Sequence, residues 1–198
     1  MVENYTIMPK TKNPQSIYCI EGDWASKPAN SISVMKALDF LKSIHEINFE
    51  IKDCITKEEL KARFELYRQR PYDNYGICYF ACHGTNGNIH LRDNSKKQHV
   101  FSLDEVADIA DGALKGRIVH FGCCNTLQNE KKARLFLEKT EAKAVCGYKN
   151  TVLFLKSTLL DILLFEKIQD FKNGGPIESR MNKLYEGMID ELGFVMYY

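Results

Sequence analysis

Short apolar segments alternate with longer amphipathic segments along most of the chain. The short segments are rich in β-branched and aromatic residues, which is typical of strands buried on both faces of a sheet. The longer segments repeat their apolar residues every three or four positions, which indicates helices. This alternation predicts an α/β fold, a three-layer sandwich in which a mostly parallel sheet carries helices on both faces. The six principal strands are expected at residues 16–21, 48–51, 75–82, 117–122, 142–147 and 194–198.

Local signals mark where several helices and one hairpin begin. Capping boxes, which satisfy free N–H groups of a first helical turn, occur at Thr56-Lys57-Glu58-Glu59 and Ser102-Leu103-Asp104-Glu105. A further helix is expected from about Ser31, with an apolar face made of Ile32, Met35, Leu38, Leu41 and Ile44. Other helices are expected at 130–139, 153–171 and 177–192, with Gly174-Gly175-Pro176 ending the second of these. Asn86-Gly87, followed by the alternating Asn88-Ile89-His90-Leu91, predicts a tight β-hairpin.

Composition narrows the possible classes of protein. The chain has 198 residues and a mass of 22.8 kDa, which fits a single domain spanning residues 1–198. The formal net charge is +1 and basic residues alternate with acidic ones, so we expect no binding to nucleic acid. Neither of the glycine-rich phosphate-binding motifs occurs, and we therefore expect no nucleotide or other cofactor.

The chain also lacks the features of a membrane or exported protein. Its first residues include an acid and no apolar stretch, so we expect no signal peptide. The apolar stretch at 151–165 contains Lys156 and Asp161 and is too short to span a bilayer. Seven cysteines, an odd number, favour free thiols in a reducing compartment. We therefore expect a cytoplasmic protein that does not bind membranes.

Two predicted strands end in residues that together could carry out acyl transfer. One ends in Cys82-His83-Gly84 and the other in Gly122-Cys123-Cys124-Asn125-Thr126. Because the carboxyl ends of parallel strands meet at one edge of a sheet, we expect His83 and Cys124 to lie there. An imidazole favours the thiolate form of a cysteine and can later protonate a leaving amine. Gly84 could bring its backbone N–H close to a developing oxyanion.

Each of these residues also has an ordinary structural interpretation. A histidine often caps a turn, and a cysteine often packs as a small apolar residue. A third interpretation is a metal or redox site made of Cys82, His83, Cys123 and Cys124. It is disfavoured because the chain has no Cys-x-x-Cys and because adjacent cysteines of an extended strand point to opposite faces. We therefore expect no metal.

The residues around His83 and Cys124 suggest a family. His83-Gly84 followed by Cys124-Asn125-Thr126 resembles the caspase-like cysteine peptidases of clan CD, and most of all the CHAT subgroup, whose pattern is His-Gly and then Ser-Ala-Cys-(Glu/Asn)-Thr. The His and Cys are 124 − 83 = 41 residues apart, against roughly 50 in caspases. The resemblance covers residues 75–149. It implies a six-stranded caspase-like sheet, Cys124 as nucleophile, His83 as general base and acid, and the N–H groups of Gly84 and Cys124 as oxyanion donors.

Two departures from the family pattern affect specificity and regulation. Gly122-Cys123 replaces the usual Ser-Ala, and Gly122 stands where clan members that cleave after Arg or Lys often have Asp. Glu21 or Asp23, at the end of the first strand, would have to supply that acid if the substrate is basic. CHAT domains are commonly fused to other modules, so a regulatory protein partner is a further expectation. We expect a cysteine endopeptidase acting on proteins or peptides; the alternative is a catalytically silent caspase-like interaction or signalling domain.

The remaining reactive side chains are expected to be structural. Cys19, Cys78 and Cys146 lie inside predicted strands and Cys54 flanks a helix, so all four are expected to pack. His120 is expected to be a structural histidine within a strand. His90 and His99 flank a polar hairpin and are expected to be exposed, and Glu21 and Asp23 are read most simply as solvated loop acids.

Overall fold

The computed structural model describes residues 15–25, 32–45, 47–92 and 99–198. Its main sheet has six strands in the order β2-β1-β3-β7-β8-β9, and every neighbouring pair in the described part is parallel except β8 and β9. These strands are β1 (Ile17–Glu21), β2 (Phe49–Asp53), β3 (Ile77–Ala81), β7 (Ile118–Phe121), β8 (Ala144–Tyr148) and β9 (Phe194–Tyr197). The predicted six-stranded, mostly parallel sheet is confirmed.

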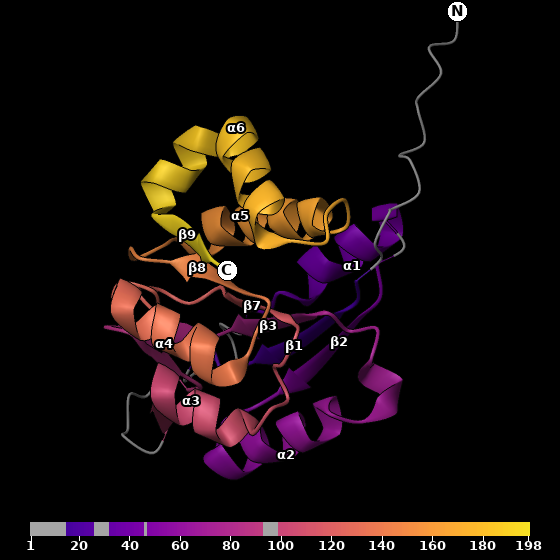
Figure 1. The fold of residues 1–198 in the computed structure, drawn as a ribbon, viewed down its shortest axis with the longest axis vertical. Coiled ribbons are helices and arrows are strands. Elements are labelled where there is room, and N and C mark those ends of the chain that lie inside the picture. The colour runs from indigo at the N-terminus through magenta and orange to yellow at the C-terminus, as the bar shows by residue number, and fades with distance from the viewer. Residues whose placement is uncertain (1–14, 26–31, 46, 93–98) are drawn as a thin grey trace, which may run out of the picture.

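Helices cover both faces of this sheet (Figure 1). One face carries α1 (Met35–His45), α5 (Phe154–Ile168) and α6 (Gly174–Leu192); the other carries α2 (Lys57–Tyr67), α3 (Leu103–Ala110) and α4 (Glu130–Thr140). A separate apolar cluster fills the space between the sheet and each helical layer. Every residue of β1, β3, β7 and β8 is buried, which explains why these strands read as continuous apolar runs.

A second, three-stranded sheet follows β3 directly. It consists of β4 (His83–Thr85), β5 (Asn88–His90) and β6 (Val100–Ser102), paired antiparallel in the order β4-β5-β6. Asn86 and Gly87 form the turn between β4 and β5 with φ values of 50° and 78°. Positive φ at both central residues is what a two-residue hairpin turn requires, so the predicted hairpin is confirmed.

Both predicted capping boxes are present. The Thr56 hydroxyl accepts from the Glu59 N–H at the start of α2, and the Ser102 hydroxyl accepts from the Glu105 N–H at the start of α3. In each box the glutamate carboxylate reaches back to the backbone N–H of the capping residue. A short 3₁₀ helix at Arg70–Tyr72 follows α2.

Two helix boundaries differ from the prediction. Ser31 lies outside the described residues, and α1 begins at Met35, so its buried side chains are Leu38 and Leu41, with Val34 buried just before it. Ile32, Met35 and Ile44 are exposed instead. The glycines at 174 and 175 do not end α5, which stops at Ile168; they form the first turn of α6. A side chain at Gly174 would lie 2.8 Å from the Tyr198 ring, so the position needs glycine for packing.

The histidine predictions have mixed outcomes. His120 is completely buried, as a structural histidine should be. His90 and His99 are also buried, which corrects the expectation that they are exposed. The reason is that β5 is the central strand of the small sheet, and that His99 bonds the Ile55 carbonyl through Nδ1 at 2.9 Å.

The strand order identifies where a site should form. β1 is flanked by β2 on one side and β3 on the other, so the chain changes direction across the sheet between β1 and β3. In open α/β sheets, ligands bind in the crevice beyond the carboxyl ends of the strands at such a switch point. Residues 21–24 leave β1 at this place and His83 leaves β3 beside them. None of the helices in the described part of the chain is long and apolar enough to cross a membrane.

Candidate functional site

Cys124 follows β7 at the carboxyl edge of the sheet. Cys123 is fully buried in the apolar cluster that includes side chains of α3 and α4, whereas Cys124 is half-buried. Asn125 has a φ of 54°, a left-handed conformation that asparagine tolerates better than most residues. Its side-chain amide donates to Thr151 Oγ1 at 2.9 Å and its backbone N–H donates to the Asn150 carbonyl at 3.0 Å. The cysteine loop is therefore tied to the segment after β8.

This segment also holds the cysteine sulfur. The Val152 N–H donates to Cys124 Sγ at 3.4 Å, and the Cys124 thiol donates to the Val152 carbonyl at 3.5 Å. One backbone residue therefore occupies both hydrogen-bonding roles of the thiol. Access to the sulfur depends on where residues 150–152 lie.

His83 is held by Trp24, which follows β1. His83 Nε2 lies 2.9 Å from the Trp24 carbonyl, and because a carbonyl only accepts, Nε2 carries the proton. In the neutral imidazole Nδ1 is then the basic nitrogen. The Trp24 ring also meets the His83 ring edge-on at 5.2 Å and, on its other side, the Phe154 ring at 5.2 Å. Trp24 thus lies between His83 and Phe154, and Phe154 is two residues after Val152 in the chain.

Gly84 brings the two strand ends into contact. A Cβ at this position would lie 2.4 Å from the Cys124 carbonyl oxygen, 2.6 Å from Thr126 Oγ1 and 2.9 Å from Cys123 Cβ. Real Cβ contacts are never this short, so only glycine permits the approach. The Gly87 N–H in the hairpin turn donates to the Asn125 carbonyl at 3.0 Å. The hairpin that carries His83 is therefore fastened to the loop that carries Cys124.

Cys82 and Cys123 pack against each other beneath the site. Their sulfurs are 3.1 Å apart and both side chains are buried. Burial raises the pKa of the Cys123 thiol well above its usual value, and the hydrogen bond with Cys82 adds to this. The Cys124 sulfur bonds Val152 of the segment after β8 instead. Within the described residues no group of three His, Cys, Asp or Glu side chains is placed to hold a metal.

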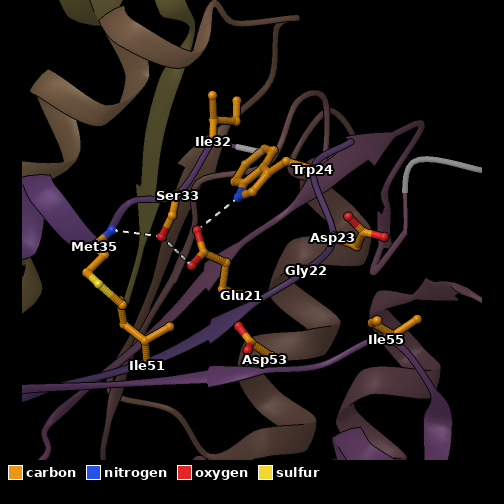
Figure 2. Close-up of a pocket in the computed structure, with 10 residues that line it drawn as sticks. All are labelled: Glu21, Gly22, Asp23, Trp24, Ile32, Ser33, Met35, Ile51, Asp53 and Ile55. Carbon is orange, nitrogen blue, oxygen red and sulfur yellow. Dashed lines mark hydrogen bonds between the residues drawn. The ribbon is translucent and has the colours of Figure 1, made fainter. Parts of the chain in front are cut away.

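A pocket of about 420 Å³ opens beside Trp24, between the ends of β1 and β2 (Figure 2). Its apolar lining comes from Trp24, Ile32, Met35, Ile51 and Ile55, and its carboxylates are Glu21, Asp23 and Asp53. Figure 2 shows the indole of Trp24 pointing toward the Glu21 carboxylate, Asp53 on the neighbouring strand below Glu21, and Asp23 beyond Gly22. Trp24 therefore both lines the pocket and contacts His83.

The two acids expected at the end of β1 have different surroundings. Glu21 is buried, not solvated, because it accepts from Trp24 Nε1 at 2.9 Å, the Val34 N–H at 2.9 Å and Ser33 Oγ at 2.7 Å. Asp23 is half-buried and forms an ion pair with Arg92 at 3.6 Å.

The space that a side chain at position 122 would occupy is filled from α5 and β3. A Cβ on Gly122 would lie 2.7 Å from the Tyr79 ring and 3.1 Å from Asp161 Oδ2. Asp161 is buried and accepts from Tyr79 Oη at 2.7 Å, Tyr148 Oη at 2.5 Å and His120 Nε2 at 2.6 Å. Its carboxylate is thus paired inside the core and cannot serve a substrate from that position.

His120 is the cation of this network. Burial opposes its charged form, but the Asp161 carboxylate in contact with it, aided by Cys146, outweighs burial and raises the pKa of His120 to about 10. Burial, followed by the nearby Asp161, raises the pKa values of Tyr79 and Tyr148 well above the usual range. The network is an ion pair with two neutral phenols, and it anchors α5 to β3, β7 and β8.

Comparison with known proteins supports the fold. The structure resembles that of a secreted C11 cysteine protease from Bacteroides thetaiotaomicron in complex with an irreversible peptide inhibitor, with a TM-score of 0.53 and 10% sequence identity. The match covers 87% of this chain and 58% of that one, so the chain spans little more than half of that protease. C11 proteases belong to clan CD, and the fold expected from the resemblance is therefore confirmed. Residues 14–198 match the model of a family of unknown function, DUF6642, and no curated protein matches.

Several residues of the site were not singled out from the sequence. Trp24 is the single tryptophan and lies at the end of the first strand, so the rule that sites form at strand ends could have found it. Val152 and Phe154 carry no such signal, because a backbone contact to sulfur and a ring contact depend on the path of the chain. Asp53 ends β2 and could have been found by the same rule as Trp24.

Proposed function

Since the chain belongs to DUF6642, a family of unknown function, we propose its activity from its own site: a caspase-like cysteine endopeptidase with Cys124 as nucleophile and His83 as general base and acid. The observation that carries this proposal is the contact between the two strand ends, where the Gly84 backbone packs directly on the Cys124 carbonyl. It supports a shared site because β3 and β7 are adjacent parallel strands in register. The resemblance at His83-Gly84 and Cys124-Asn125-Thr126 makes a CHAT-like peptidase the finer form of the proposal.

The proposed reaction is acyl transfer in two steps. His83 takes the Cys124 proton through Nδ1, and the thiolate attacks the carbonyl carbon of the scissile peptide bond. The oxyanion that forms is stabilised by the N–H groups of Gly84 and Cys124. The imidazolium of His83 then protonates the leaving amine and an acyl-enzyme remains. A water molecule that gives its proton to His83 hydrolyses the thioester and restores Cys124.

The pocket beside Trp24 is the proposed place for a substrate side chain. Its walls are apolar and its open side carries Asp23 and Asp53, so it suits a side chain with an aliphatic stem and a polar or cationic end. Asp23 is the proposed contact of the two acids at the end of β1, because Glu21 is buried and accepts three hydrogen bonds from the protein, whereas Asp23 is half-buried and its pair with Arg92, at 3.6 Å, is one that a substrate cation could replace.

A library of unlabelled peptides of varied sequence, analysed by mass spectrometry after incubation, tests the proposal. We expect cleavage by the natural chain, none by Cys124→Ala, and retained cleavage by Cys123→Ala, which changes the neighbouring buried thiol. Cleavage that persists in Cys124→Ala would contradict the assignment.

A second function is favoured by one observation, the bonding of the Cys124 thiol to both backbone groups of Val152. A catalytically silent interaction or signalling domain would keep this contact permanently. A peptidase regulated by a partner protein would release it on binding. The two differ in the library experiment when the partner protein is present, because a silent domain then still leaves every peptide intact.

A further inference from the structure

Glu21 is the centre of a hydrogen-bond network at the end of β1. Its Oε1 accepts from Trp24 Nε1 and from the Val34 N–H, and its Oε2 accepts from Ser33 Oγ (Figure 2). The side chain is 5% exposed. Buried carboxylates are stable only when such donors surround them, and bonds to a charged acceptor are about twice as strong as neutral ones. This network therefore fixes Glu21 and its donors relative to one another.

The network leaves Glu21 poorly suited to bind a substrate cation. A cationic side chain would have to displace Trp24, Ser33 or Val34 from a carboxylate that they already satisfy. The Ser33 hydroxyl also accepts from the Met35 N–H at 3.1 Å, which joins the carboxylate to the first turn of α1. The contacts of Glu21 are all with the protein itself, and they lead from the start of α1 to the indole of Trp24.

Trp24 in turn contacts His83. The indole is held at Nε1 by Glu21, and its edge-on contacts with the His83 and Phe154 rings are both at 5.2 Å between centroids. The carbonyl of the same residue accepts from His83 Nε2. Trp24 thus contacts His83 through its ring and through its backbone, and its indole N–H bonds Glu21.

We propose that Glu21 is a positioning residue for His83, acting through Trp24 to fix the orientation and the tautomer of the imidazole. This proposal rests on the proposed His83–Cys124 chemistry, but the effect on the imidazole itself does not. It assigns Glu21 a role different from that of a specificity acid. The other titratable groups around this chain of contacts are Asp23 and Asp53 in the pocket and His90, which is paired with His83 across β4 and β5.

Variants of the full-length chain can separate positioning from substrate binding. Glu21→Ala removes all three acceptor bonds. Glu21→Gln keeps an oxygen for Trp24 and Val34 and can donate to Ser33 Oγ, so it should rescue the function. Trp24→Phe keeps the carbonyl and a ring but loses the indole N–H. Glu65→Ala, which removes an exposed glutamate side chain of α2 outside both the network and the pocket, is the control.

Two measurements are made on each variant after its fold has been checked by circular dichroism. The first is ¹⁵N NMR of the His83 ring, which reports the tautomer. The second is the rate at which iodoacetamide labels Cys124 as a function of pH, with His83→Ala as reference. We expect Glu21→Ala to lose the Nε2–H signature and to label about tenfold more slowly at pH 6.5, the scale of losses caused by misplaced supporting groups. Glu21→Gln and Glu65→Ala should stay within about twofold of the natural chain on the same scale.

Each result decides the proposal. A folded Glu21→Ala with an unchanged His83 spectrum overturns it, as does a Glu21→Gln that is as damaging as Glu21→Ala, because charge and not geometry would then matter. If Glu21→Ala fails to fold, Trp24→Phe must show an altered His83 spectrum for the proposal to hold. If His83→Ala labels like the natural chain, the proposed peptidase chemistry fails, while the His83 spectrum of Glu21→Ala still tests the positioning.

Discussion

At the scale of single residues, the site depends on a glycine that no other residue can replace. Gly84 lies where a side chain would overlap the Cys124 carbonyl and Thr126 Oγ1. The sequence indicated Gly84 as an oxyanion donor, but the close packing between the strand ends is visible only in three dimensions.

Gly84→Ala is expected to destabilise the fold by about 1–3 kcal/mol, the usual range for overpacking, and to abolish peptide cleavage by separating the hairpin from the Cys124 loop. Chemical denaturation and the peptide library measure the two effects. Gly187→Ala is the control, because a Cβ there meets nothing within 4 Å and the position is helical. It should leave cleavage intact and raise stability by about 0.5–1 kcal/mol. Full stability and activity in Gly84→Ala would show that the close contact is absent in solution.

Residue-scale predictions from the sequence had clear limits. His83, Gly84 and Cys124 could be singled out because strand ends and neighbouring residues are visible in the sequence. The burial of Glu21 could not be predicted, because its donors Ser33 and Val34 come from a different segment. The same holds for the contact between Cys124 and Val152, 28 positions apart.

At the scale of elements, a buried ion pair holds α5 on the sheet. Asp161 of α5 bonds Tyr79 of β3, His120 of β7 and Tyr148 of β8. Removing one partner of such a pair leaves an uncompensated buried group. Asp161→Asn is therefore expected to lower the free energy of unfolding by about 3–5 kcal/mol, measured by urea denaturation. A loss below about 1 kcal/mol, the size typical of exposed pairs, would mean that the network does not support the fold.

The same pair makes stability depend on pH. The folded-state pKa of His120 is raised from 6.5 to about 10, so the folded protein holds this proton more tightly than the unfolded chain. The stabilisation is present in full below about pH 6.5 and is lost as the pH rises to about 10. Denaturation curves between about pH 6.5 and 8, below the usual pKa values of thiols and phenols, should show falling stability, and Asp161→Asn should show a shallower slope. Equal slopes in this range would exclude His120 as the source.

Elements were predicted with uneven success for physical reasons. The inner strands β1, β3, β7 and β8 were found because burial on both faces produces continuous apolar runs, and α2 and α3 were found because of their capping boxes. The start of α1 was misplaced because Ile32 and Met35 have helical spacing but lie on the surface. Gly174-Gly175 was read as a stop because the contact with Tyr198, which requires small residues there, joins distant parts of the chain.

At the scale of the whole molecule, all seven cysteines are free thiols in the structure. Titration of the denatured protein with a thiol reagent, after purification without reductant, should therefore give seven thiols per chain. The reason is that each cysteine side chain is a free thiol in the fold. A count of five would place a disulfide in the chain, with Cys82 and Cys123 the first pair to examine, and would contradict the free thiols of the structure.

The whole-molecule fold was predictable from alternation and from one short resemblance, whereas the activity was not. The structural neighbour, with a TM-score of 0.53 and 10% sequence identity, supports the fold. The proposed chemistry is argued from Cys124 and His83 themselves. The pocket beside Trp24 also depends on the whole fold, because its lining comes from β1, β2 and the start of α1.

We propose Cys124 as the nucleophile of a peptidase, with His83 as its general base and acid. The most direct test is the intact mass of the protein after incubation with a peptide chloromethyl ketone, from which the attacking sulfur displaces chloride to form a thioether, followed by mapping of the adduct. We expect one adduct per chain, on Cys124, formed by the natural protein and by Cys123→Ala but not by Cys124→Ala, and formed much more slowly by His83→Ala. An adduct on another cysteine, or a rate on Cys124 that is the same with and without His83, would contradict it.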